Sequence, residues 1–125
     1  MANVLIIDDD SKLLEMMAEF LTLKGWTTAT ASSGRAGLAE AARRVPDVVL
    51  SDVNLPDIDG FAVARALHDG AETADVPVVL ISGAEKSPKS MEKGLDEGSQ
   101  GYLLKPIDLR LMEAKLKSLL PAKPQ

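Results

Sequence analysis

Side chains that could do chemistry stand at the ends of four short apolar runs in this sequence. They are Asp8 and Asp9, Asp52, Ser82 and Lys105. Carboxylates beside an amine and a hydroxyl suit phosphoryl transfer, because an aspartate can be the nucleophile and the amine can neutralise phosphoryl oxygens. The hydroxyl of Ser82 could hydrogen-bond one of those oxygens. The five residues can cooperate only if the fold brings the ends of the runs together.

The run that ends at Asp52 is the one around which the others are arranged. Residues 48–50 are all apolar and show no polar alternation, which is typical of a strand covered on both faces. Pro56 and the Asp59-Gly60 pair follow, so the strand is expected to stop at Asp52. In open α/β sheets, ligands bind beyond the carboxyl ends of the strands. Asp52 is therefore expected at a functional edge.

Apolar runs and helical patterns alternate five times along the chain. Strands are expected over 4–7, 26–31, 48–52, 76–81 and 102–104, and helices over 11–25, 33–44, 61–70, 87–97 and 108–120. This alternation predicts an α/β fold, a flavodoxin-like, doubly wound parallel sheet of five strands in the order 2-1-3-4-5, with five helices on its two faces.

Several acidic and hydroxyl residues are expected to cap helices or form turns. Ser11 and Asp108 are placed to cap the first and last helices, and Asp57 and Asp59 are expected to be turn or cap residues. The helix expected over 87–97 is weak, because it has few large apolar residues and an interior glycine. A marginal helix of this kind could act as a bistable element.

A cation is expected where the acidic residues meet. In the strand order given above, the first and third strands are neighbours, so Asp8, Asp9 and Asp52 would share one pocket. Carboxylates that close repel one another unless a cation or a proton compensates. The pocket offers oxygen ligands only, and the sequence has no cysteine, which points to Mg²⁺ with Mn²⁺ as an alternative.

Length, charge and composition limit the remaining possibilities. The chain has 125 residues, which fits one domain over 1–120 followed by a tail or the start of a linker over 121–125. The formal net charge is −5, which disfavours direct nucleic-acid binding by this domain. No apolar run approaches the roughly 18 residues that a membrane span needs. Without cysteine or a signal peptide, a cytoplasmic location is expected.

The sequence resembles the receiver domains of two-component response regulators over essentially its whole length. The resemblance is carried by the segments Ile6–Asp10, Asp52–Gly60, Val79–Ala84, Gly94–Gly98 and Gly101–Pro106. It implies that Asp52 accepts the phosphoryl group. It also implies that Asp8 and Asp9 are the acidic pair, with Asp9 as a direct metal ligand, and that the backbone carbonyl of Asn54 binds the metal. Ser82 would be the switch hydroxyl and Tyr102 the switch aromatic. Lys105 would bind the phosphate and precede a cis Pro106.

The same resemblance implies a signalling function. The phosphoryl group would come from a sensor histidine kinase or a histidine phosphotransfer protein, and the domain would catalyse only its own phosphorylation and dephosphorylation. Phosphorylation would alter the face formed by the helix over 87–97, the strand over 102–104 and the last helix. That face would bind a downstream protein, contact an attached output domain or form a homodimer.

Two positions depart from the commonest family pattern. Ser82 replaces the usual threonine, so the hydroxyl is kept and the methyl group is lost. Gly83 stands where alanine is common and adds backbone freedom. Both changes bear on how tightly the switch is coupled to phosphorylation.

Two other functions remain open from the residues alone. A small phosphatase could use an aspartyl-phosphate intermediate, but such enzymes of the haloacid dehalogenase type carry an Asp-x-Asp element at the first strand, whereas Asp8 and Asp9 are adjacent here. A flavodoxin-like cofactor binder would need a Ser-, Thr- or Gly-rich loop after the first strand. The loop is acidic instead, which would repel a phosphate.

Overall fold

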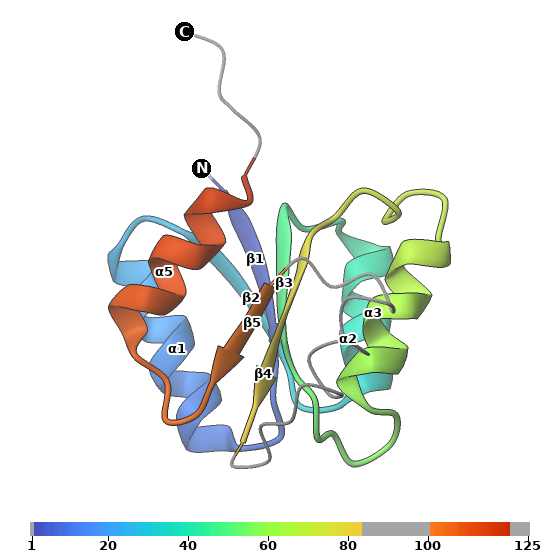
Figure 1. The fold of residues 1–125 in the computed structure, drawn as a ribbon. Helices are drawn as coiled ribbons and strands as arrows, with labels where there is room; N and C mark the ends of the chain where they lie inside the picture. The colour runs from blue at the N-terminus through green and yellow to red at the C-terminus, as the bar shows by residue number, and fades with distance from the viewer. Residues whose placement is uncertain (1, 84–100, 121–125) are drawn as a thin grey trace, which may run out of the picture.

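A parallel five-stranded sheet forms the centre of the protein, with helices on both of its faces (Figure 1). The computed structural model describes residues 2–83 and 101–120. The strands are β1 (Asn3–Ile7), β2 (Thr27–Ala31), β3 (Val48–Asp52), β4 (Val78–Ser82) and β5 (Gly101–Leu104), and the helices are α1 (Ser11–Leu23), α2 (Gly34–Arg43), α3 (Gly60–Asp69) and α5 (Leu109–Ser118). The strand order is β2-β1-β3-β4-β5, which confirms the predicted topology. The helix expected over 87–97 lies outside the described residues.

Two apolar layers, one on each face of the sheet, make up the core. Helices α1 and α5 cover one face, and α2 and α3 cover the other (Figure 1). Successive strand residues point to opposite faces. On β1, Val4 and Ile6 therefore pack under α1 and α5, whereas Leu5 and Ile7 pack under α2 and α3. Every residue of β3 and β4 is buried, as expected for central strands covered on both sides.

The same alternation sorts the candidate site residues between the two faces. Asp52 continues the series of Val48 and Leu50, which pack under α1 and α5. By contrast, Ser82 follows Val78 and Leu80, which belong to the opposite layer. Strand β5 behaves in the same way, because Leu103 packs with α1 and α5 whereas Tyr102 packs with the α2 and α3 layer. The carboxylates and the two proposed switch residues thus start from opposite faces of one sheet.

Most expected element ends agree with the structure to within a few residues, and the differences have local causes. Strand β4 begins at Val78 rather than at residue 76, because the Val76 N–H donates to the Thr73 carbonyl at 3.0 Å and Pro77 has no N–H to give. Strand β2 begins one residue later than expected, because the Trp26 N–H donates to the Leu21 carbonyl at the end of α1.

The expectation that Ser11 caps the first helix is wrong. Helix α1 already includes Ser11, and Asp10 is the N-cap, with its carboxylate accepting from the Leu13 N–H at 3.2 Å. Both residue types can cap a helix, but Asp10 is one residue closer to the strand and its acid suits the positive end of the helix dipole. Asp59 and Asp108 do cap α3 and α5. Among the described residues, no helix is both long and apolar enough to cross a membrane.

Candidate functional site

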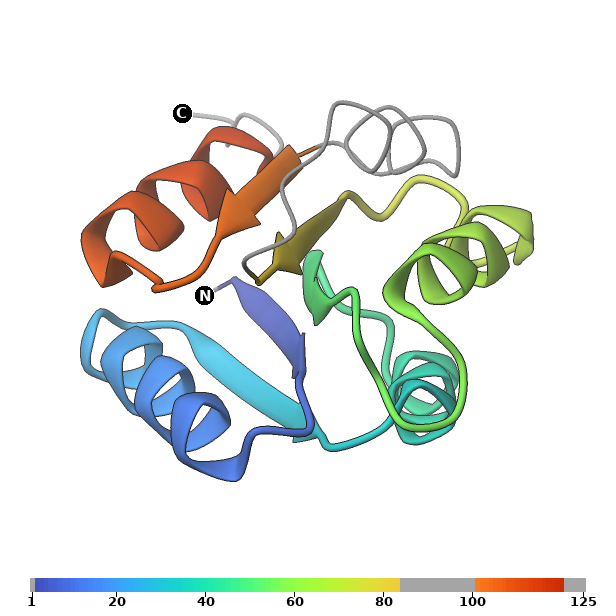
Figure 2. The ribbon, with the colours of Figure 1, turned by 60° about the horizontal axis from the view of Figure 1, so that its bottom comes forward.

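The carboxyl ends of the strands meet along one rim of the sheet, which Figure 2 brings forward. Asp8 directly follows β1, Asp52 ends β3, and Lys105 directly follows β5. Strands β1 and β3 are neighbours, with Ile7 opposite Ser51, so the two aspartates come side by side. Because all five strands are parallel, the loops that leave these ends share the rim. The structure therefore brings together three side chains that lie at least 44 positions apart in the chain.

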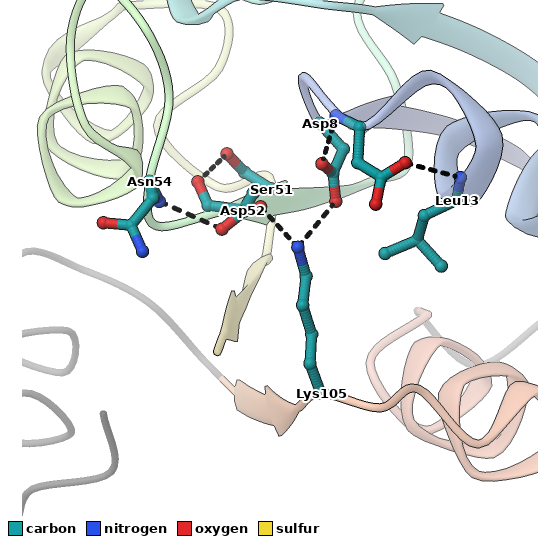
Figure 3. Close-up of polar contacts among 7 residues, drawn as sticks. Asp8, Leu13, Ser51, Asp52, Asn54 and Lys105 are labelled. Carbon is teal, nitrogen blue, oxygen red and sulfur yellow. Dashed lines mark hydrogen bonds and ion pairs between the residues drawn. The ribbon is translucent and has the colours of Figure 1, made fainter. Parts of the chain in front are cut away.

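The Lys105 ammonium is the centre of this group (Figure 3). Its Nζ donates to Oδ2 of Asp52 at 2.8 Å and forms an ion pair with Oδ2 of Asp8 at 3.6 Å. Both carboxylates are almost fully buried, whereas the Lys105 side chain is 27% exposed. One partly exposed cation thus offsets two buried negative charges.

Lys105 is held in this position by its own backbone. Its N–H donates to the Ser82 carbonyl at 2.8 Å, and the peptide bond to Pro106 is cis, as the resemblance implied. Partial burial alone would lower the pKa of the Lys105 amine. The hydrogen bond to Asp52 and the charges of Asp52 and Asp8 outweigh burial and raise the pKa. The amine therefore stays a cation at neutral pH.

Asp8 carries the least well compensated charge of the group. Its side chain is fully buried, and its Oδ1 accepts from the Asp10 N–H at 2.9 Å. Its Oδ2 has no hydrogen-bond partner among the described residues. Burial and the nearby Asp52 carboxylate raise the pKa of Asp8 to about 6, against the lowering effects of the Asp10 amide and Lys105. A charge held this way is costly unless a further cation joins it.

Asp52 is held from both sides. Its Oδ1 accepts from the Asn54 N–H at 2.9 Å, and its Oδ2 accepts from Lys105. Its backbone is closely packed too, since a Cβ on Gly60 would lie 2.9 Å from Cα of Val53 and would meet the Asp52 carbonyl oxygen. The turn expected after Asp52 therefore requires glycine at residue 60. This packing fixes the direction in which the carboxylate points.

Oxygen ligands for a divalent cation are grouped at this rim. Carboxylate oxygens of Asp8, Asp9 and Asp52 all lie within 4.8 Å of one another. Asp9 is exposed, so the group opens to solvent on that side. Oδ2 of Asp8, which has no hydrogen-bond partner among the described residues, and the all-oxygen set fit a hard cation such as Mg²⁺, which takes one or two carboxylates and keeps several waters. The sequence prediction that these three residues share a pocket is confirmed.

Ser82 and Tyr102 lie at the ends of the next two strands. Ser82 is buried at the end of β4, opposite Leu104 of β5. Tyr102 lies opposite Leu80, two residues before Ser82, and its hydroxyl is buried without a hydrogen-bond partner in the described part of the chain. The two side chains follow the same face of the sheet. A movement of Ser82 would therefore alter packing on the face of the sheet where Tyr102 lies.

Asp57 has a role that sequence reasoning did not assign to it. It was expected to be a turn or cap residue, and it does act as a cap, but the sequence did not indicate for which helix. Its carboxylate accepts from the N–H groups of Gly34 and Arg35, at the start of α2. No local spacing signals this contact, because its partners lie more than 20 positions away. Helix α2 shows a hydroxyl cap of its own, Ser33.

Comparisons with known proteins agree with this geometry. The family model of the response regulator receiver domain matches residues 4–117. The response regulator PleD of Caulobacter vibrioides is 37% identical over 118 residues, which is 94% of this chain and 26% of PleD. The transcriptional regulatory protein PrrA of Mycobacterium tuberculosis is 39% identical over 94% of this chain and 49% of its own length. This chain thus spans about a quarter to a half of these relatives.

A solved structure of similar length has the same fold. The chemotaxis response regulator CheY4 of Vibrio cholerae superposes with a TM-score of 0.91 at 32% identity, covering 96% of this chain and 99% of that one. The match confirms the flavodoxin-like topology and the resemblance that the sequence motifs indicated.

Proposed function

The chain belongs to the response regulator receiver family, and we propose that it accepts a phosphoryl group on Asp52 while Asp8, Asp9, Asp52 and the Asn54 carbonyl hold Mg²⁺. The observation that carries the proposal is the pairing of Lys105 with both Asp52 and Asp8 at the carboxyl rim. A buried group of one cation and two carboxylates contributes little net stability, because the free-energy cost of removing these charges from water offsets their attraction. It is well placed to receive phosphoryl oxygens.

The proposed reaction is an in-line transfer to the Asp52 carboxylate. One carboxylate oxygen forms a bond to phosphorus, the bond from phosphorus to the donor atom breaks, and the electron pair leaves with the donor. Both oxygens of Asp52 are engaged here, by Asn54 and by Lys105. Lys105 must therefore shift from the carboxylate toward a phosphoryl oxygen. Bound at this rim, Mg²⁺ would neutralise part of the negative charge on the phosphoryl group.

The proposed output signal passes through Ser82 and Tyr102. The Ser82 hydroxyl would bond a phosphoryl oxygen and move inward, and the Tyr102 ring would respond on the same face of the sheet. Ser82 and Leu80 lie two residues apart on β4 and therefore point to the same face of the sheet. Tyr102 lies opposite Leu80 and packs on that face, which supports this path. Ser82 lacks the methyl group of threonine, so the coupling is expected to be looser than in relatives that carry threonine.

The partners also form part of the proposal. Phosphoryl donors would be a sensor histidine kinase or a histidine phosphotransfer protein, in line with family membership. The names of PrrA and PleD describe a transcriptional regulatory protein and a response regulator, which supports control of an attached output domain or of a separate protein. A homodimer through the face formed by the helix expected over 87–97, β5 and α5 remains a prediction from the sequence, as do the domain bounds of 1–120 and a cytoplasmic location.

Phosphotransfer from a phosphohistidine donor tests this function. A purified histidine kinase labelled on its histidine is mixed with this protein, with and without Mg²⁺. Transfer that needs Mg²⁺ and is lost in Asp52→Asn is the expected result. Transfer that is unchanged by chelation of Mg²⁺, or equal in Asp52→Asn, would overturn the proposal.

The switch is tested separately with beryllofluoride, a mimic of the phosphoryl group. Amide exchange around Ser82 and Tyr102 is measured before and after the mimic is added with Mg²⁺. We expect slower exchange at both positions in the complex. No change at either residue would remove Ser82 and Tyr102 from the proposed signal path while leaving phosphorylation of Asp52 intact.

A further inference from the structure

The loop between β3 and α3 is tied to helix α2 by one carboxylate. Oδ1 of Asp57 accepts from the Gly34 N–H at 2.9 Å, and Oδ2 accepts from the Arg35 N–H at 2.8 Å. The Arg35 guanidinium adds a longer ion pair at 3.9 Å. Hydrogen bonds from backbone amides, that of Arg35 being the largest cause, lower the pKa of Asp57 to about 2. The carboxylate is therefore charged, and the contact persists, throughout the neutral pH range.

Asp57 and Ser33 divide the capping of α2 between them. The first N–H groups of a helix lack partners within the helix and need acceptors from elsewhere. Ser33 Oγ accepts from the Ala36 N–H at 3.1 Å, whereas Asp57 takes the two N–H groups before it. Ser33 directly precedes the helix, but Asp57 belongs to the loop that follows the Asp52 strand. Of these two caps, only Asp57 connects that loop to α2.

Side-chain packing makes the same connection. A Cβ on Gly34 would collide with the Ile58 side chain, so α2 can approach the loop this closely only because residue 34 is glycine. Three residues later, a Cβ on Gly37 would collide with Ile7, which directly precedes Asp8. Helix α2 thus contacts the loop after Asp52 and the strand end before Asp8.

The loop has few other restraints between its ends. At the start, the Asn54 N–H is bound to Asp52, and at the finish the Gly60 N–H donates to the Val53 carbonyl at 2.8 Å. Between them, Leu55 and Ile58 are partly buried against the core layer under α2 and α3. Hydrophobic packing restrains position without direction. Asp57 supplies directional bonds at the middle of the loop.

We propose that Asp57 is a positioning residue for the metal site: by anchoring the loop after Asp52 to the start of α2, it holds the Asn54 backbone ready to bind the cation beside Asp8, Asp9 and Asp52. The inference rests on the proposed function, because it takes Asn54 as a metal ligand. It adds to that function a residue that touches neither the cation nor the phosphoryl group. Partners that orient metal ligands in this way contribute measurably to metal affinity.

Two alanine variants separate positioning from stability. Asp57→Ala removes both acceptors from α2 and releases the loop. Ser33→Ala also removes a cap from the start of α2 but leaves the loop attached, so it is the matched control. Both should lower the melting temperature by comparable amounts. Mg²⁺ binding is then measured by calorimetry at a temperature where all variants are folded, and the Asn54 amide is followed by NMR in the metal-free proteins.

The two variants should differ in Mg²⁺ binding. Asp57→Ala should weaken Mg²⁺ binding about three- to tenfold, which is at or below the roughly tenfold minimum typical of partners that contact a metal ligand directly, because Asp57 acts through the loop. It should also shift and broaden the Asn54 amide signal before any metal is added. Ser33→Ala should keep the wild-type affinity to within about twofold, which is the scatter expected for a substitution away from the ligands. Asp57→Asn, which keeps one acceptor, should fall between the two.

The same data identify failure. Equal Mg²⁺ affinity in Asp57→Ala and the wild type, or equal weakening in Ser33→Ala, would overturn the positioning role while leaving the proposed function in place. An unmodified protein whose Mg²⁺ binding is absent, or does not change in Asp52→Asn, would overturn the proposed function and this inference together.

Discussion

Lys105 and Asp52 form a 2.8 Å ion pair in which the amine comes from β5 and the carboxylate from β3, two strands away across β4. The carboxylate proposed to accept the phosphoryl group is therefore neutralised before any donor arrives. The same amine lies 3.6 Å from Asp8. Because one ammonium group is shared by two carboxylates, the group as a whole carries a net negative charge.

Removing the shared cation should destabilise the metal-free protein. Lys105→Met leaves Asp8 and Asp52 buried and unpaired, so we expect a loss of about 1–3 kcal/mol in the free energy of unfolding. Added Mg²⁺ should restore more stability to this variant than to the wild type. Urea unfolding with chelator and with Mg²⁺ measures both effects. Lys117→Met is the control, because the Lys117 side chain is largely exposed and Glu113 keeps its hydrogen bond from Trp26 Nε1, so the loss of this 3.8 Å ion pair should change stability by less than about 1 kcal/mol. Equal stability of Lys105→Met and the wild type in chelator would contradict this reading of the site.

Neutralising Asp8 should have the opposite effect. The folded-state pKa of Asp8 is raised to about 6 from an ordinary value of 3.8, so the folded protein binds this proton more tightly than the unfolded chain. The stability of the metal-free protein should therefore fall as pH rises from about 4 to about 6, and then level off, with a total change of about 3 kcal/mol or less. Asp8→Asn should remove that loss and be more stable than the wild type at neutral pH without metal.

Unfolding curves at acidic and neutral pH in chelator check this prediction. The two proteins should become equally stable below about pH 4, where Asp8 is protonated in both states. Asp9→Asn serves as a control, because Asp9 is exposed and its charge loses little hydration in the folded protein. An Asp8→Asn variant that is less stable than the wild type at neutral pH without metal would show that the Asp8 charge is well compensated.

Protons should compete with Mg²⁺ for this site. Because Asp8 must be ionised to help hold the cation, Mg²⁺ affinity should be steady above the pKa of about 6 and fall as pH drops below it. Calorimetric titrations in buffers of different ionisation enthalpy should detect proton release near pH 6 and none well above it. Affinity that stays constant through this range would exclude Asp8 from the metal site.

Two glycines beside the site should respond differently to alanine. A Cβ at Gly60 would meet the backbone of Asp52 and Val53, so Gly60→Ala should cost about 1–3 kcal/mol and disturb the phosphoacceptor strand. Among the described residues, a Cβ at Gly83 would meet no atom within 4 Å, so Gly83→Ala should leave stability unchanged or raise it by up to about 1 kcal/mol. Thermal unfolding of both variants makes the comparison. A Gly60→Ala protein as stable as the wild type would show that the backbone of Asp52 and Val53 can move away from the added Cβ. A strongly destabilised Gly83→Ala protein would show that the space beside residue 83 is not open.

Residues whose roles follow from strand order could be predicted from the sequence. Asp8, Asp52 and Lys105 each stand at the end of an apolar run, and parallel strands place such ends on one rim. Asp108 could be recognised as a helix cap because its partners are only two and three residues away. Local signals and sheet topology were sufficient in these cases.

Contacts that depend on three-dimensional proximity of loops could not be predicted. Asp57 reaches Gly34 across 23 positions, and an aspartate in a turn carries no sign of which helix it will cap. The choice between Asp10 and Ser11 as the first cap is similar, because both residue types serve and the strand end decides. Close carboxylates were expected to raise one another's pKa, but burial, which is the largest cause of the raised pKa of Asp8, was not suggested by its place in an acidic run.

The most direct test of the central claim is to locate the phosphoryl group after reaction with acetyl phosphate. Borohydride reduction converts an aspartyl phosphate to a stable product, and mass spectrometry of the digested protein identifies the modified residue. We expect modification at Asp52 alone, only in the presence of Mg²⁺, and none in Asp52→Asn or after chelation. Modification at Asp8 or Asp9 of the wild type, or undiminished labelling of the Asp52→Asn protein, would contradict the assignment of Asp52 as the phosphoacceptor.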